Sequence, residues 1–336
     1  MSADRFTRWL STAVAGLALP LAAQAATLQE VRDFGSNPAG LRMLVQLPAM
    51  PPPRAALVVA LHGCTQEADT YAQAGWSDYA LERGFFLLLP EQSALEHLTN
   101  SCWSWFRGED DARGAGQAAS IVAMIAWLSA RHDIDPRRIY VDGLSAGGWF
   151  VPELLADYPD VFAGGASHAG GPAFCAEVQR PFWDWFGWWT AMTGGTLAAQ
   201  CMRGVELPPR DWAERARAHA PPQWRGAWPV LSIWQGSADF VVAPSNQRAL
   251  LQQWLALHGA DALPDSSEQA GARGRALHQR FDDAAGRAVA ETWHIEGMAH
   301  GIAIDAAPGA RCGRVSDFVL DVGLCAARRV GAFWGL

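Results

Sequence analysis

The sequence lacks several features that mark common classes of protein. Its basic residues are scattered, they form no basic stripe, and the formal net charge is −8 at pH 7. This charge pattern excludes nucleic acid and an anionic membrane surface as expected partners. No Cys-x-x-Cys pair occurs, which argues against a zinc or thiol redox site. The sequence also has no internal repeat and no Ser/Thr-rich linker to a second module.

Long apolar runs are also absent, apart from one near the N-terminus. It extends from Trp9 to Ala23, follows two arginines and is interrupted by Pro20. Because it is shorter than the roughly 20 residues of a spanning helix, stable membrane insertion is not expected. Small residues on either side of Gln24 complete the pattern of a secretory signal peptide. Residues 1–25 are therefore predicted to be a cleaved signal, with an uncleaved anchor or a buried helix as alternatives, and the mature protein to be secreted or periplasmic.

Six cysteines occur in a chain that is predicted to leave the reducing cytoplasm. An even number of cysteines in this setting favours disulfides, although spacing alone allows many pairings. The preferred pairs are those that close short loops, together with the two cysteines that remain. They are Cys175 with Cys201, Cys312 with Cys325, and Cys64 with Cys102.

Strand and helix patterns alternate along the rest of the chain. Continuous apolar runs at residues 55–61 and 85–89 are typical of parallel strands that are buried on both faces. Apolar residues at helical spacing predict a helix within residues 114–131. The other predicted strands are 41–47, 139–141, 161–167, 228–234 and 293–295, and the other predicted helices are 71–83, 149–158 and 244–258. This alternation predicts an α/β fold with a mostly parallel central sheet and helices on both faces.

Residues 26–336 fit one large catalytic domain. Within it, residues 172–226 are dense in Trp, Pro and Cys, and we interpret them as a cap or insertion over the carboxyl edge of the sheet. Their Trp-rich part, 182–189, is either a binding surface or the packed core of a lid, since tryptophan serves both roles. Residues 261–274 are predicted to be a polar loop.

One short motif carries the first functional prediction. Gly143-x-Ser145-x-Gly147 follows a predicted strand and opens a predicted helix. This is the context of a nucleophile elbow, in which glycines permit a strained turn that exposes the serine hydroxyl. An isolated pattern of this kind is weak evidence, but its position between a strand and a helix predicts that Ser145 is a nucleophile.

A serine nucleophile needs a histidine to take its proton and a carboxylate to orient the imidazole. In hydrolases with this elbow, the acid and then the histidine follow the serine in the chain. Asp239 comes just after a buried strand, and His300 lies on a late glycine-flanked loop. We therefore predict Asp239 as the acid and His300 as the base. His294 is the alternative base, and Asp265 and Asp282 are the alternative acids.

Acyl transfer also needs hydrogen-bond donors that face the developing oxyanion. The amide after the nucleophile, that of Ala146, is the first candidate. The second is the amide of Cys64, in the loop that follows the strand at residues 55–61, with Gly63 as the alternative. We expect His62 to brace this loop. The proposed chemistry requires no metal and no organic cofactor.

Several motifs together resemble a known family. They are Leu61-His-Gly-Cys-Thr-Gln66, Pro90-Glu-Gln92, Cys102-Trp-Ser-Trp-Phe106, Asp111-Ala-Arg-Gly114 and Gly143-Leu-Ser-Ala-Gly-Gly148. They are similar to the catalytic domain of extracellular short-chain poly(3-hydroxybutyrate) depolymerases and their feruloyl esterase relatives. The resemblance implies an α/β-hydrolase fold, a triad of Ser145, Asp239 and His300, and an oxyanion hole that involves Cys64.

The sequence thus predicts a serine ester hydrolase that acts on a polyester or ester substrate, most simply short-chain poly(3-hydroxyalkanoate) or its oligomers. The absence of a linked substrate-binding module argues against attack on crystalline granules. Alternative functions are a feruloyl or acetyl esterase of plant polysaccharide, a poly-amino-acid amide hydrolase, and a non-catalytic binding protein. Trp103, Trp105 and Phe106 either line the acyl pocket or form a buried cluster next to Cys102. The sequence makes no prediction of the oligomeric state.

Overall fold

The computed structural model describes residues 28–92, 101–178, 197–271 and 274–336. The predicted signal peptide and the Trp-rich segment 182–189 lie outside these residues. Within the described ranges, no helix has the length and apolarity needed to cross a membrane. The described strands are β1 (Gln29–Val31), β2 (Arg42–Gln46), β3 (Ala55–Leu61), β4 (Phe86–Glu91), β5 (Ile134–Leu144), β6 (Gly164–His168), β7 (Val230–Gly236), β8 (Ser266–Ala270), β9 (Ala276–Asp282), β10 (Ala288–Ile295), β11 (Ile302–Ile304) and β12 (Val319–Asp321).

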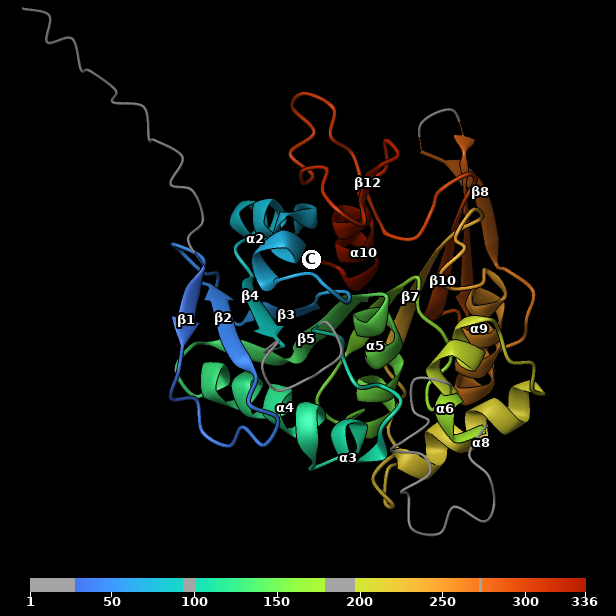
Figure 1. The fold of residues 1–336 in the computed structure, drawn as a ribbon, viewed down its shortest axis with the longest axis horizontal. Helices are drawn as coiled ribbons and strands as arrows, with labels where there is room; N and C mark the ends of the chain where they lie inside the picture. The colour runs from blue at the N-terminus through green and yellow to red at the C-terminus, as the bar shows by residue number, and fades with distance from the viewer. Residues whose placement is uncertain (1–27, 93–100, 179–196, 272–273) are drawn as a thin grey trace, which may run out of the picture.

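A ten-stranded sheet in the order β1-β2-β4-β3-β5-β6-β7-β10-β9-β8 forms the centre of the described structure (Figure 1). Neighbouring strands from β4 through β10 run parallel, whereas the pairs at both edges are antiparallel. The short strands β11 and β12 pair separately. The predicted mostly parallel sheet is confirmed, and the carboxyl ends of its parallel strands meet at one edge.

Helices cover both faces of the sheet, as predicted. On one face lie α4 (Gly116–Ser129), α5 (Ala146–Asp157), α8 (Pro209–His219) and α9 (Ser245–His258). On the other lie α1 (Ala68–Tyr71), η1 (Ala72–Trp76), α2 (Ser77–Arg83) and α10 (Ala326–Trp334). Successive side chains of β3 alternate between the two cores, and all seven of its residues are buried. The continuous apolar run in this strand therefore reflects burial on both faces.

The far edge of the sheet differs from its sequence prediction. Residues 261–274 were predicted to be a polar loop, but they contain β8, which pairs antiparallel with β9. The side chains of β8 are almost all exposed, so the strand shows no apolar alternation that a sequence pattern would reveal. The strand predicted at residues 139–141 is also longer, because β5 begins at Ile134.

The described parts of segment 172–226 lie in the helix layer beside α9. They include α6 (Cys175–Val178), residues 197–202 and α8. The disulfide between Cys175 and Cys201 links the first two. Trp212 on α8 is fully buried in the core that α5 and α9 share.

A partly buried ionic contact fastens the end of α8 to the rest of this layer. His219 Nε2 lies 3.0 Å from Glu177 Oε1 on α6, and His219 Nδ1 lies 3.6 Å from Asp157 Oδ1 on α5. The imidazole also stacks on Phe174, with ring centroids 3.5 Å apart. Burial alone would lower the pKa of His219, but the two carboxylates outweigh it and raise the pKa to about 9.

This contact predicts a pH-dependent stability. The pKa of Asp157 is itself raised to about 6 by burial, so its negative charge is complete only above that pH. Because the pKa of His219 is higher in the folded than in the unfolded state, the contact stabilises the fold most near neutral pH and progressively less as the pH rises through about 9. We expect His219→Gln, which keeps polarity but loses the charge, to lower the free energy of unfolding by roughly 2 kcal/mol at pH 7. Denaturant unfolding from pH 5 to 10 measures the effect. A deficit that stays constant over this range would contradict the ionic role.

Candidate active site

Ser145 lies at a sharp turn between β5 and α5. Its φ of 56° and ψ of −117° are unusual for a residue with a side chain. The amide of Ser145 donates to His168 O on β6 at 2.9 Å, which fixes the turn to the neighbouring strand. The strand, the turn and the helix therefore have the arrangement of a nucleophile elbow, as the sequence motif predicts.

The elbow is packed so closely that its glycines cannot carry a side chain. A Cβ on Gly147 would lie 2.5 Å from Leu61 O and 2.8 Å from His62 O. A Cβ on Gly148 would lie 2.5 Å from His168 O. The ends of three neighbouring strands can thus approach one another only because these positions lack a Cβ.

Three polar side chains form a continuous hydrogen-bonded chain at the carboxyl edge of the sheet. His300 Nε2 lies 2.8 Å from Ser145 Oγ, and His300 Nδ1 lies 2.8 Å from Asp239 Oδ2. Each residue follows a different parallel strand, β5, β7 or β10. The structure therefore brings together the serine, the aspartate and the histidine that the sequence analysis selected.

The carboxylate of Asp239 is buried, and both of its oxygens accept hydrogen bonds. Its Oδ1 accepts hydrogen bonds from the amides of Val241 and Val242, both at 2.9 Å, and its Oδ2 accepts one from Gln235 Nε2 at 3.0 Å. Burial acts to raise the pKa of Asp239, but the bonds from His300 and these amides keep it below the usual value. The carboxylate thus stays ionised and fixes the orientation of the imidazole.

The alternative residues lie elsewhere. His294 on β10 contacts Gln247 Oε1 through its Nδ1 at 3.2 Å. The exposed Asp265 accepts a hydrogen bond from the amide of Asp282, at the outer strands β8 and β9. None of the three alternatives belongs to the hydrogen-bonded chain that contains Ser145.

The loop after β3 lies beside the serine and is held by buried polar contacts. The amide of Gly63 donates to Gln66 Oε1 at 2.8 Å, and Gln66 Nε2 donates to Asp317 O at 2.9 Å. The imidazole of His62 spans the loop, since its Nδ1 donates to Gly63 O and its Nε2 accepts from the amide of Gln92. Burial lowers the pKa of His62, in keeping with this neutral form. The predicted bracing role of His62 is confirmed.

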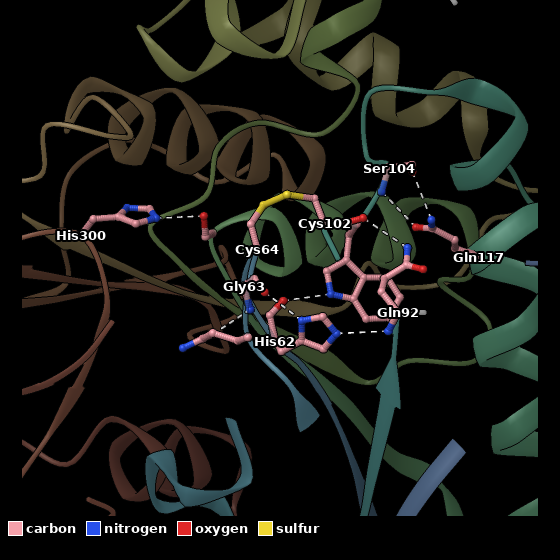
Figure 2. The surroundings of a disulfide bond; sticks show 11 residues. His62, Gly63, Cys64, Gln92, Cys102, Ser104, Gln117 and His300 are labelled. Atoms are coloured by element: carbon pink, nitrogen blue, oxygen red, sulfur yellow. Dashed lines mark hydrogen bonds between the residues drawn. A yellow bond between two sulfur atoms is a disulfide. The ribbon is translucent and has the colours of Figure 1, made fainter. Parts of the chain in front are cut away.

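A disulfide joins this loop to the segment that follows β4. Figure 2 shows the bond between Cys64 and Cys102, with His62 and Gln92 below it and His300 to one side. Gln92 Nε2 donates to Cys102 O at 3.3 Å, so side-chain and covalent contacts hold the same segment. All three predicted pairings are confirmed, namely Cys64–Cys102, Cys175–Cys201 and Cys312–Cys325.

The aromatic residues after Cys102 are mostly core residues. Trp103 is fully buried, stacks on Phe150 and donates its indole N–H to His62 O at 2.9 Å. Trp105 is buried and stacks on Trp149 with ring centroids 4.4 Å apart. Phe106 is half-buried. This burial favours the packed-cluster interpretation for both tryptophans over the acyl-pocket prediction.

A second histidine lies directly beneath the elbow. His168 is buried, and its Nε2 lies 2.8 Å from Asp142 Oδ2. The other oxygen of this carboxylate accepts hydrogen bonds from Tyr71 and from Trp76 Nε1. The contact of His168 with Ser145 is through its backbone carbonyl, so the side chain supports the fold next to Ser145.

Sequence reasoning missed two residues of this site. The long-range bonds of Gln66 join segments 251 residues apart, and a local pattern carries no signal for such a contact. Phe318 lies with its ring edge-on to the His300 imidazole, at a centroid distance of 5.8 Å. Only the tertiary structure shows that this residue reaches the histidine.

Known proteins with similar sequences are ester hydrolases. The family model described as Esterase PHB depolymerase matches residues 43–178. The chain is 40% identical over 311 residues to poly(3-hydroxyalkanoate) depolymerase C of Paucimonas lemoignei. This matched region covers 92% of this chain and 70% of that protein. It is 32% identical to feruloyl esterase B of Neurospora crassa over 73% of this chain and 80% of that protein.

Solved structures agree with the fold. An acetyl xylan esterase from Aspergillus awamori superposes with a TM-score of 0.71 and covers 92% of this chain and 99% of that chain, at 22% sequence identity. The predicted α/β-hydrolase fold is confirmed by this similarity. The sequence matches go further than the fold, and together they show that the chain is a carboxylic ester hydrolase that belongs to the esterase PHB depolymerase family.

Proposed function

We propose that this esterase works through Ser145 as nucleophile, His300 as general base and Asp239 as the residue that orients the imidazole. The observation that carries the proposal is the chain of two 2.8 Å hydrogen bonds from the serine through the histidine to the aspartate. In this mechanism His300 takes the proton of Ser145 as the hydroxyl attacks the ester carbonyl. The imidazolium then protonates the leaving alcohol, and water releases the acyl group from the serine.

The amides of Cys64 and Ala146 are the proposed donors to the oxyanion. Within the described residues neither amide has a hydrogen-bond acceptor, whereas the amide of Gly63 is used by Gln66. A free donor is required at this position because the oxyanion forms only during the reaction. The occupied amide of Gly63 supports Cys64 as the second donor.

For the substrate we propose short-chain poly(3-hydroxyalkanoate) or its soluble oligomers. The 40% identity to a protein named poly(3-hydroxyalkanoate) depolymerase C supports this class. The 32% identity to a feruloyl esterase supports the second candidate, a feruloyl or acetyl ester of plant polysaccharide. We further propose that residues 26–336 act as a single catalytic domain and that the protein is exported. The three disulfides of the structure support export.

Removal of the serine hydroxyl tests the mechanism. We expect Ser145→Ala to lower kcat by a factor of at least about 10⁴, because the acyl intermediate cannot form. The substrates are p-nitrophenyl butyrate, amorphous poly(3-hydroxybutyrate), methyl ferulate and acetylated xylan. Ser245→Ala on α9 is the matched control, since it removes a hydroxyl from another element. Full activity of a folded Ser145→Ala enzyme would exclude the proposed triad.

The same assay separates the substrate classes. Serine-dependent release of hydroxybutyrate oligomers supports the polyester proposal. Activity on methyl ferulate or acetylated xylan, with none on the polyester, would reject that proposal in favour of the second candidate.

The oxyanion proposal predicts an indirect effect of Gln66. Gln66→Ala removes the acceptor that holds the Gly63 amide and the donor to Asp317 O, so the adjacent Cys64 amide loses its fixed position. Loss of a direct oxyanion donor costs about 10² to 10³ in kcat, and we expect this indirect change to cost roughly tenfold to a hundredfold, with little change in KM. Steady-state kinetics on p-nitrophenyl butyrate measures both constants.

Gln73→Ala is the matched control for this variant. Gln73 is a glutamine in the same region, and its side chain contacts the exposed Asp69. We expect this variant to keep the parental kcat. An unchanged kcat in folded Gln66→Ala would show that the loop does not need this support.

A further inference from the structure

Phe318 is a large apolar residue that reaches the solvent beside the candidate base. Its ring lies 5.8 Å from the His300 ring, centroid to centroid, with an interplanar angle of 77°. The residue is 38% exposed, whereas His300 beside it is buried. One part of the ring therefore contacts the imidazole, and another part is open to a bound molecule.

The backbone of Phe318 is strained and firmly held. Its φ is 61°, a conformation that is rare for a bulky side chain. Phe318 O accepts a hydrogen bond from the amide of Ile302 at 2.8 Å, and a Cβ on Gly301 would lie 2.6 Å from the same oxygen. Gly301 and Ile302, the residues directly after His300, thus lie in close contact with the backbone of Phe318. Strain of this kind persists only where the surroundings over-determine it, and it is concentrated at functional sites.

A second contact connects the segment that contains Phe318 to the loop after β3. Asp317 O accepts the hydrogen bond from Gln66 Nε2, and Gln66 Oε1 accepts the one from the Gly63 amide. The position of Phe318 is therefore set from both sides, by the histidine loop and by the loop after β3. A side chain placed in this way has a defined location relative to the reacting atoms.

We propose that Phe318 contacts the alcohol half of the ester and selects substrates by the size and polarity of that half. This inference rests on the proposed function. In ester hydrolysis by a serine and a histidine, the Ser145 Oγ–carbon bond forms, the carbon–alcohol oxygen bond breaks, and His300 Nε2 transfers its proton to the alcohol oxygen. The leaving alcohol must therefore lie within hydrogen-bonding distance of His300, and a group that flanks the imidazole also flanks the alcohol.

The chemistry of the ring determines the preferred alcohol. A phenyl edge and face offer apolar contact and no hydrogen bond to a hydroxyl group. An apolar alcohol, such as the next hydroxyalkanoate unit of a polyester or a plain alkyl alcohol, gains from burial against the ring. A sugar alcohol would lose hydration of its hydroxyl groups without compensation. Phe318 thus favours esters whose alcohol half is apolar.

Two series of esters test this assignment on the full-length mature enzyme. One keeps the butyryl group and varies the alcohol through methyl, butyl and benzyl, and the other keeps methanol and varies the acyl group. We expect Phe318→Ala to lower kcat/KM about tenfold for the butyl and benzyl esters and less than about twofold for methyl butyrate. The acyl series should keep its parental order. The relative rate on acetylated xylan should rise against that on hydroxybutyrate oligomers.

Two further variants control for structural damage. Phe318→Asn removes the ring but tolerates the positive φ, so it should show the same selective loss if Phe318→Ala folds poorly. Met50→Ala removes a highly exposed apolar side chain from the segment before β3, at the opposite edge of the parallel strands, and should leave both series unchanged.

The outcomes separate the two proposals. An equal loss for all alcohols would overturn the assignment and indicate that Phe318 only supports His300. No change in either series would also overturn it. Retained hydrolysis by Ser145→Ala would instead reject the proposed triad, a result independent of the alcohol series.

Discussion

The other parts of the site depend on one contact, in which two glycines of the elbow pack directly against the backbone of the neighbouring strands. Gly147 packs against the carbonyls at the end of β3, and Gly148 packs against the carbonyl of His168 at the end of β6. Any side chain at either position would push the start of α5 away from a neighbouring strand. Since Ser145 follows β5 and Cys64 follows β3, the same contact sets the distance between the serine and the adjacent loop. Ser145 and the proposed oxyanion donor are therefore positioned together.

A buried polar cluster keeps these strand ends in register. The carboxylate of Asp142 on β5 accepts hydrogen bonds from Tyr71, Trp76 and His168, and so joins the helices of one face to two strands of the sheet. A carboxyl group without partners would be costly at this depth, but three hydrogen-bond partners compensate for its lost hydration. The network lies three residues before Ser145. It fixes the end of β5 where the elbow demands an unusual backbone conformation.

The sequence was sufficient to predict the parallel strands of the sheet and the members of the hydrogen-bonded chain. In a parallel sheet the carboxyl ends of strands meet at one edge, so Asp239 and His300, each after a strand, could be placed beside Ser145 from strand positions alone. The edge strand β8 was missed because its side chains are exposed and carry no apolar pattern. Burial of Trp103 was undecided, because a pocket wall and a core both favour aromatic residues. The role of Gln66 depends on a partner 251 residues away, which no local pattern reveals.

The contacts of the site form a closed ring. Ser145 bonds to His300, the loop of His300 holds Phe318, the adjacent Asp317 holds Gln66, and Gln66 fixes the loop that packs against the elbow. Because these contacts form a closed ring, a shift of any one of its loops would also displace Ser145 or His300. A change in the backbone of these loops would therefore alter substrate specificity only at the expense of the geometry between these two residues. Side chains that project from the ring toward solvent can change without that cost. Relatives in this family carry names with different ester substrates, as expected when substrate choice depends on the site and not on the fold. Differences in substrate should therefore be sought at positions such as Phe318, where the backbone is fixed and the side chain is free to vary.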